Sequence, residues 1–304
     1  MAYTKLIPHF TPGAKVEEYS DGDRGKAYRL FIPSGPADKY RVAQLDDYTK
    51  LSRGRFPLHS PLSLSLSARA SSNSIPGTWG FGLWNDPFGL SLGFGGNPFR
   101  LPALPNSVWF FGASKESYLS FKAHRAERNE ERTSRSAVEA RDTNASLASA
   151  APANGFLAQT FRSPKFHPLL IAAGLALPFS RKLTRRLIGI VIGEDGISLS
   201  RERSPLAPPA RAGVARLPAQ ESTPYTLDVT QWHRYSLYWR EDRVSFKVDD
   251  ALVFESPVSP HPPLGLVIWI DNQYAAFTPE GKIGFGVLEN PEPTWLEVKE
   301  IDVT

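Results

Sequence analysis

The chain has 304 residues and no cysteine, so it can form no disulfide, thiolate metal site or cysteine nucleophile. Long apolar runs are also missing. The longest, residues 168–179, has 12 residues, whereas a membrane-spanning helix needs about 20. The N-terminus lacks the apolar segment of a secretory signal. We therefore expect a cytoplasmic protein, with a leaderless route of export as the alternative.

Motifs of common catalytic chemistry are absent as well. The six histidines are dispersed without the spacing of metal ligands. The chain has no Gly-x-Ser-x-Gly elbow and no phosphate-binding loop. We therefore expect no metal and no cofactor.

What the chain does contain is a series of short alternating segments. Its 27 prolines and 23 glycines suit frequent turns. In Leu62–Ala70 leucine alternates with serine, which is the pattern of a strand with one buried face. Gly77–Trp84 and Ser107–Gly112 indicate further strands. Together these segments predict an all-β fold.

The segment Gln231–Phe254 has the most regular pattern. Val244, Phe246 and Val248 alternate with polar residues, and charged residues stand at 240–243 and 249–250, where turns are expected. This segment predicts three antiparallel strands in a row.

Three segments resemble the laminarinase-like (family 16) glycoside hydrolases and their concanavalin A-like relatives. They are Gly77–Trp84, Trp232–Asp249 and the closing segment Trp295–Val303. The resemblance extends over residues 60–121 and 223–303. It implies a concanavalin A-like jelly-roll sandwich built as one domain, residues 1–304, and a scaffold that handles glycans.

The strand that carries the chemistry of that family is different in this chain. Family enzymes have Glu-x-Asp-x-x-Glu there, or a variant one residue longer, and use two of the carboxyls as nucleophile and general acid/base. The equivalent strand, residues 106–114, has no carboxylate and has Trp109 and Phe111 where the acids are expected. We therefore expect a non-hydrolytic binding protein. The weaker alternative is an enzyme with relocated acids, Asp86 and Glu116.

Aromatic side chains are the candidate ligand contacts. By analogy with the family, six of them are candidates for the lining of the concave sheet: Trp79, Phe81, Trp109, Phe111, Trp269 and Tyr274. Such a face stacks on the sugar rings of a glycan or glycoconjugate, or accepts a flat apolar small molecule. The alternative interpretation is that these side chains fill the core between two sheets. The period of a strand separates residues 79, 81 and 83 from Gly80, Gly82 and Trp84, and one of these faces must be core.

A basic insertion is predicted at residues 122–220. Residues 122–216 carry 16 Lys and Arg against 8 Asp and Glu, whereas the rest of the chain has 19 against 23. We expect the insertion to be partly helical, with a charged helix or linker, an apolar segment at 164–193 and a Pro-rich loop. Its basic and acidic residues are interleaved and no recognition motif accompanies them, so no nucleic-acid partner is expected.

The apolar segment of the insertion has two interpretations. Four basic residues beside it suit contact with an anionic membrane surface: Arg181, Lys182, Arg185 and Arg186. In the other interpretation the segment is a buried helix whose basic C-terminal end is favoured by the helix dipole.

Overall fold

The computed structural model describes residues 6–22, 25–87, 103, 105–119, 155–163, 219–277 and 283–304. Strands form two seven-stranded sheets, in which all neighbours are antiparallel, and one three-stranded sheet. The described residues contain no α-helix, and η2 (Arg53–Arg55) is a short 3-10 turn. The helix expected in the insertion lies outside these residues and stays a prediction.

The three sheets draw on strands from the whole chain. Sheet A contains, in spatial order, β1 (Ile7–Phe10), β4 (Val42–Asp46), β14 (Gly265–Asp271), β6 (Thr78–Trp84), β7 (Ser107–Ala113), β9 (Gly155–Arg162) and β10 (Ala219–Pro224). Sheet B contains β13 (Ala251–Ser256), β12 (Val244–Val248), β11 (His233–Trp239), β5 (Leu62–Ala70), β17 (Thr294–Val303), β3 (Lys26–Ile32) and β2 (Lys15–Ser20). The small sheet contains β16 (Ile283–Val287), β15 (Gln273–Phe277) and β8 (Tyr118–Leu119).

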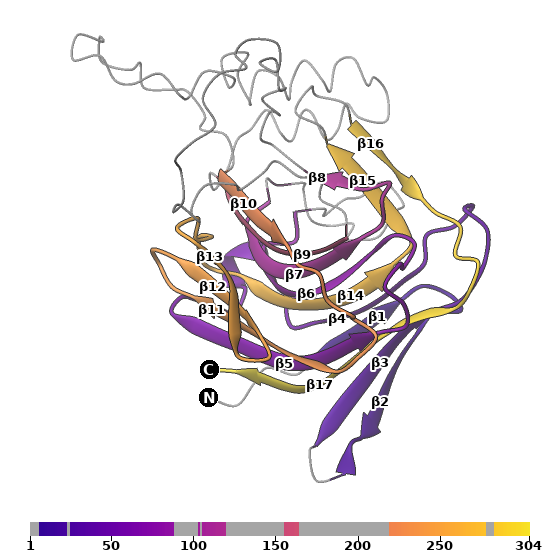
Figure 1. The fold of residues 1–304 in the computed structure, drawn as a ribbon, viewed down its shortest axis with the longest axis horizontal. Coiled ribbons are helices and arrows are strands. Elements are labelled where there is room, and N and C mark those ends of the chain that lie inside the picture. Colours follow the sequence, from indigo (N-terminus) through magenta and orange to yellow (C-terminus); the bar gives the residue numbers. More distant parts are fainter. Residues whose placement is uncertain are drawn as a thin grey trace, which may run out of the picture.

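Sheets A and B are stacked, and strands that are neighbours in space are mostly distant in sequence (Figure 1). Sheet A curves, with its concave face turned away from sheet B (Figure 1). This arrangement is the concanavalin A-like jelly-roll sandwich that the sequence predicted. The three strands expected in Gln231–Phe254 are confirmed as β11, β12 and β13, which pair in sequence order at one edge of sheet B.

The predicted insertion supplies part of sheet A. β9 lies inside residues 122–220 and pairs with β7 over its length, from Ser107 opposite Phe161 to Ala113 opposite Gly155. β10 begins at Ala219 and pairs with β9. The apolar segment 164–193 and its four basic residues lie outside the described residues, so the membrane contact stays a prediction. No helix in the described part of the chain has the length and apolar character that crossing a bilayer requires.

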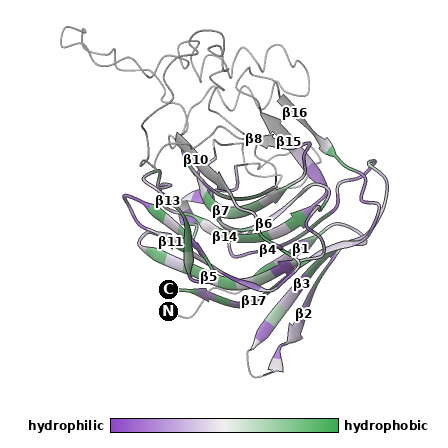
Figure 2. Ribbon diagram, in the orientation of Figure 1, coloured by the Kyte–Doolittle hydropathy of each residue, from purple (hydrophilic) through white to green (hydrophobic). Residues whose placement is uncertain are grey.

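The core lies between sheets A and B. Leu64, Leu66 and Ala68 of β5 point into it, as their alternation with serine predicted. Hydrophobic stretches mark strands of both sheets (Figure 2). The centre of the core is aromatic, because the ring of Phe110 lies 5.1 Å from the rings of both Tyr235 and Phe246. Burial of such side chains is the main force that joins the two sheets.

The outer face of sheet B carries a buried carboxylate. Glu297 of β17 points away from the core and accepts hydrogen bonds from Arg29 on β3, at 2.8 Å, and from Arg69 on β5, at 2.7 Å. Its side chain is 3% exposed, whereas the two arginines remain 43% and 35% exposed. One carboxylate thus links three neighbouring strands.

We predict that Glu297→Gln destabilises the protein by about 1–3 kcal/mol, because a buried charge-assisted contact is removed from both arginines. The control is Glu255→Gln, which removes an exposed ion pair at 3.8 Å from Arg243 and is expected to cost less than about 1 kcal/mol. Urea unfolding of both variants measures the difference. Equal losses in the two variants would contradict the structural role of Glu297.

Candidate functional site

The central strands of sheet A, β14, β6 and β7, are buried on both faces. Along β7, Val108 and Phe110 point into the core, while Trp109 and Phe111 point to the concave face. All four side chains are at most 3% exposed. Because successive side chains of a strand alternate, the same strand feeds two separate apolar clusters.

The second cluster lies on the concave face. We call it the concave cluster, and its buried members are Tyr48, Phe56, Trp84, Trp109, Phe111, Leu157, Phe161, Val267 and Trp269. The rings of Trp84 and Trp269 are nearly parallel, at 6° and 6.0 Å between centroids. The Trp109 ring lies 5.9 Å from Trp84 and 5.6 Å from Trp269. Three tryptophans from three strands therefore meet at one place.

Two glycines of β6 make this arrangement possible. A Cβ at Gly80 would lie 2.9 Å from the Trp269 ring and 2.4 Å from the carbonyl oxygen of Phe110. A Cβ at Gly82 would lie 2.4 Å from the carbonyl oxygen of Val108 and 2.6 Å from the Cβ of Trp109. Real Cβ atoms do not approach other atoms so closely, so only glycine fits where the indoles lie against β6.

The six aromatic candidates do not lie together. Trp109, Phe111 and Trp269 belong to the concave cluster. Trp79 and Phe81 point the other way, into the core between the sheets. Tyr274 is in β15 of the small sheet, where its ring lies next to Gly286. These last three side chains therefore lie in strands, as expected, but do not contribute to the concave cluster.

The concave cluster also contains aromatic residues that were not among the six candidates, Trp84 and Phe161 among them. Trp84 shares a face of β6 with Gly80 and Gly82, which was visible in the alternation, but nothing in the alternation identified that face as the concave one. Phe161 comes from β9, which pairs with β7 although 41 residues of sequence, 114–154, separate the two strands. Such pairing has no local signal.

The concave face contains a few buried polar groups. The indole Nε1 of Trp109 donates a hydrogen bond to Oε1 of Gln159 at 3.1 Å, and Gln159 is fully buried. Ser107, two residues before Trp109, is also fully buried. The Nε2 atom of Gln159 and the Oγ atom of Ser107 have no hydrogen-bond partner within the described part of the chain.

At one end of the face, a series of hydrogen bonds leads from Trp269 through Thr78 to Asp271. Trp269 Nε1 donates to Thr78 Oγ1 at 3.0 Å, and Thr78 Oγ1 donates to Asp271 Oδ1 at 2.8 Å. Tyr40 OH donates to the other carboxylate oxygen at 3.3 Å. Burial raises the pKa of Asp271 to about 6, and the hydrogen bonds from Thr78 and the Gln273 backbone act in the opposite direction.

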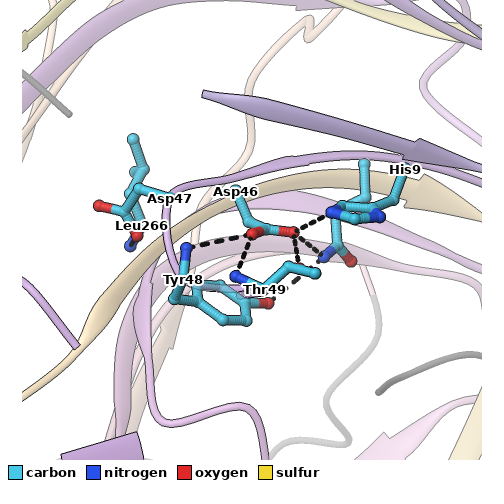
Figure 3. Close-up of polar contacts among 7 residues, drawn as sticks. His9, Asp46, Asp47, Tyr48, Thr49 and Leu266 are labelled. Carbon is cyan, nitrogen blue, oxygen red and sulfur yellow. Dashed lines mark hydrogen bonds and ion pairs between the residues drawn. The ribbon is translucent and has the colours of Figure 1, made fainter. Parts of the chain in front are cut away.

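At the other end, Asp46 is surrounded by donors (Figure 3). Its oxygens accept hydrogen bonds from the backbone of Tyr48 and Thr49, from Thr49 Oγ1 at 2.7 Å and from Gln44 Nε2 at 2.9 Å. His9 Nε2 lies 3.4 Å away. These bonds hold the turn after β4 and so position Tyr48 at the edge of the concave cluster.

The neighbouring Asp47 has few hydrogen-bond donors around its carboxylate. Its Oδ1 accepts one hydrogen bond, from the Leu266 backbone at 2.9 Å (residues drawn in Figure 3), and its Oδ2 is buried without a partner among the described residues. Burial raises the pKa of Asp47 to about 7, and the charge of Asp46 contributes in the same direction. Asp46 and Asp47 thus differ in hydrogen bonding, since Asp46 accepts four hydrogen bonds and Asp47 accepts one.

Two pairs of described carboxyls are too far apart to act on one bond. Asp46 lies opposite Val267 on β14, and Asp271 is four residues further along that strand, a separation of about 13 Å. The acid candidates Asp86 and Glu116 follow opposite ends of the β6–β7 pair, since Trp84 pairs with Ser107 and Thr78 with Ala113, which separates them by about 20 Å. The described residues contain no group of three possible metal ligands among His, Cys, Asp and Glu.

Comparison with known proteins gives only distant similarities. No family model and no curated protein matches the chain. A glycoside hydrolase family 16 endo-glucanase from Bacteroides ovatus is similar in structure with 10% identity and a TM-score of 0.42, over 98% of this chain and 94% of that chain. LamAcat from Zobellia galactanivorans has 13% identity and a TM-score of 0.39, over 91% and 76%. Identities this low transfer no function.

We predict that Asp47→Asn removes part of the pH dependence of stability. The folded-state pKa of about 7 exceeds the ordinary value of 3.8, so the unfolded chain loses its proton first as the pH rises. The folded state is therefore penalised increasingly between pH 4 and 7, by up to about 4 kcal/mol. The gain in unfolding free energy of Asp47→Asn over wild type should be larger at pH 8 than at pH 5. Urea unfolding at both pH values tests this, and a difference that is independent of pH would contradict it.

Proposed function

We propose that the protein binds a glycan or glycoconjugate on the concave face of sheet A and does not hydrolyse it. The observation that carries this proposal is the meeting of Trp84, Trp109 and Trp269, with ring centroids 5.6 to 6.0 Å apart. A sugar ring has an apolar face of C–H groups that packs against an indole, and hydroxyls that accept and donate hydrogen bonds. The concave cluster offers both kinds of contact, because buried polar groups stand among its aromatic rings.

The positions of the described carboxyls support a role without hydrolysis. A retaining glycosidase needs two carboxyls about 5–5.5 Å apart, and an inverting one about 6.5–9.5 Å. Asp46 and Asp271 are about 13 Å apart along β14, which exceeds both distances, and Trp269 of β14 lies between them. Asp46 and Asp271 therefore match neither spacing, which supports binding without cleavage.

An apolar small molecule is the second candidate ligand. The members of the concave cluster are all uncharged and buried, and pockets of this composition also accept flat apolar ligands. Such a ligand would use the aromatic rings but not the polar groups.

We predict that Trp109→Phe weakens glycan retention two- to tenfold, because the smaller ring loses about 0.5–1.5 kcal/mol of aromatic contact. Affinity electrophoresis through gels that contain neutral polysaccharides measures retention, and incubation with the retained glycan should release no reducing ends. The matched control is Trp79→Phe, the same exchange on the opposite face of sheet A, which should lower thermal stability without altering retention.

Equal retention by wild type and Trp109→Phe would contradict the use of this face. Release of reducing ends by wild type would contradict the non-hydrolytic assignment. A wild-type protein that is retained by no glycan but binds an apolar fluorescent probe would favour the second candidate.

A further inference from the structure

We propose that Gln159 and Ser107 are the specificity determinants of the concave face, and that they select a neutral sugar by hydrogen bonding to its hydroxyls. This inference rests on the proposed function. It adds the chemical class of the ligand and the two side chains that recognise it.

The orientation of the Gln159 amide is determined by its neighbour. An indole N–H can only donate, so the oxygen of the amide must face Trp109 Nε1, as the distance of 3.1 Å to Oε1 indicates. The amide nitrogen therefore points away from Trp109 with two N–H groups, and it has no partner among the described residues. A fully buried donor without a partner is costly, and such a group calls for a ligand or an ordered water.

Ser107 provides the second unpartnered group. Its neighbours in register are Trp84 on β6 and Phe161 on β9, and both belong to the concave cluster. By strand alternation its side chain shares the face of Trp109. The Oγ atom has no partner within the described ranges, and a hydroxyl can both donate and accept.

The two groups are near enough for one ligand. Gln159 is opposite Trp109, and Ser107 precedes Trp109 by two residues, so Ser107 and Gln159 are diagonal neighbours across the β7–β9 pair. Diagonal neighbours are about 7–8 Å apart. Trp109 is next to both residues on the same face. A sugar ring stacked there can place one hydroxyl toward each group.

The charges around the cluster favour a neutral ligand. The concave cluster consists of uncharged side chains. The carboxyl groups of Asp46 and Asp271 stand at the two ends of the face. Arg53 stands at the Trp84 end of the cluster, but it already donates to the carbonyl oxygens of Asn85 and Asp86. A sulfated or carboxylated sugar would lose its hydration against uncharged rings and meet the two carboxyls. A purely apolar ligand would leave Gln159 Nε2 and Ser107 Oγ unpartnered, at a cost for each group.

Two substitutions test the proposal. Ser107→Ala removes the hydroxyl without removing a hydrogen bond seen in the folded protein, so thermal stability should stay the same. Gln159→Glu keeps an acceptor for Trp109 Nε1 and removes the amide donor. Each variant is expected to weaken retention by neutral polysaccharide two- to tenfold, the effect of one lost hydrogen bond. The control is Ser65→Ala on the outer face of sheet B, where Ser65 Oγ accepts a bond from Arg234 at 3.3 Å.

The outcomes separate this inference from the proposed function. If wild type, Ser107→Ala and Gln159→Glu are retained equally while Trp109→Phe is not, the inference is wrong and the proposed function stands. Stronger retention by sulfated or uronate polysaccharides than by neutral ones overturns the neutral class. A clear loss of thermal stability in ligand-free Ser107→Ala shows that the hydroxyl is already bonded in the free protein, which also overturns the inference. If no polysaccharide retains the wild type, both are overturned.

Discussion

The whole structure depends on the burial of the central strands of sheet A, β14, β6 and β7, on both of their faces. Alternation of side chains then requires large apolar residues in both directions, and β7 supplies them as Val108 and Phe110 on one side and Trp109 and Phe111 on the other. Strands buried on both faces have nearly continuous apolar sequences. The neighbouring β6 accommodates the crowding with Gly80 and Gly82, against which the indoles of the concave cluster lie.

Burial also raises the pKa values of two carboxyls near the concave face, Asp47 and Asp271. Asp46 and Asp47 are adjacent in sequence, yet only Asp46 receives enough donors to be well solvated by the protein. A raised pKa, as at Asp47 and Asp271, is often found at catalytic sites. Here the two raised carboxyls stand at opposite ends of β14, since Asp47 is bonded to Leu266 and Asp271 ends the strand. Their pKa values therefore report desolvation and do not identify an acid/base pair.

Sheet B was the more predictable of the two sheets. Its strands have one dry and one wet face, and the alternation in Leu62–Ala70 and Val244–Val248 shows which residues are inside. In sheet A the same period separates Trp79 and Phe81 from Trp84 without saying which set faces the core, because both sets are apolar. For that reason the six aromatic candidates come from both faces of sheet A and from the small sheet. Gln159, which contacts Trp109 from 50 residues away, gave no local signal.

By itself the sequence determined that the fold is a strand-rich sandwich, that no cysteine chemistry is possible and that the strand Ser107–Ala113 has no carboxylate. These properties follow from composition and from the period of single strands. Only the tertiary structure decided which side of each strand in sheet A is concave, that Trp84, Trp109 and Trp269 meet, and that Asp86 and Glu116 stand at opposite ends of a strand pair. The reason is that register between strands is set by packing of distant segments, and a local pattern contains no information about its partner.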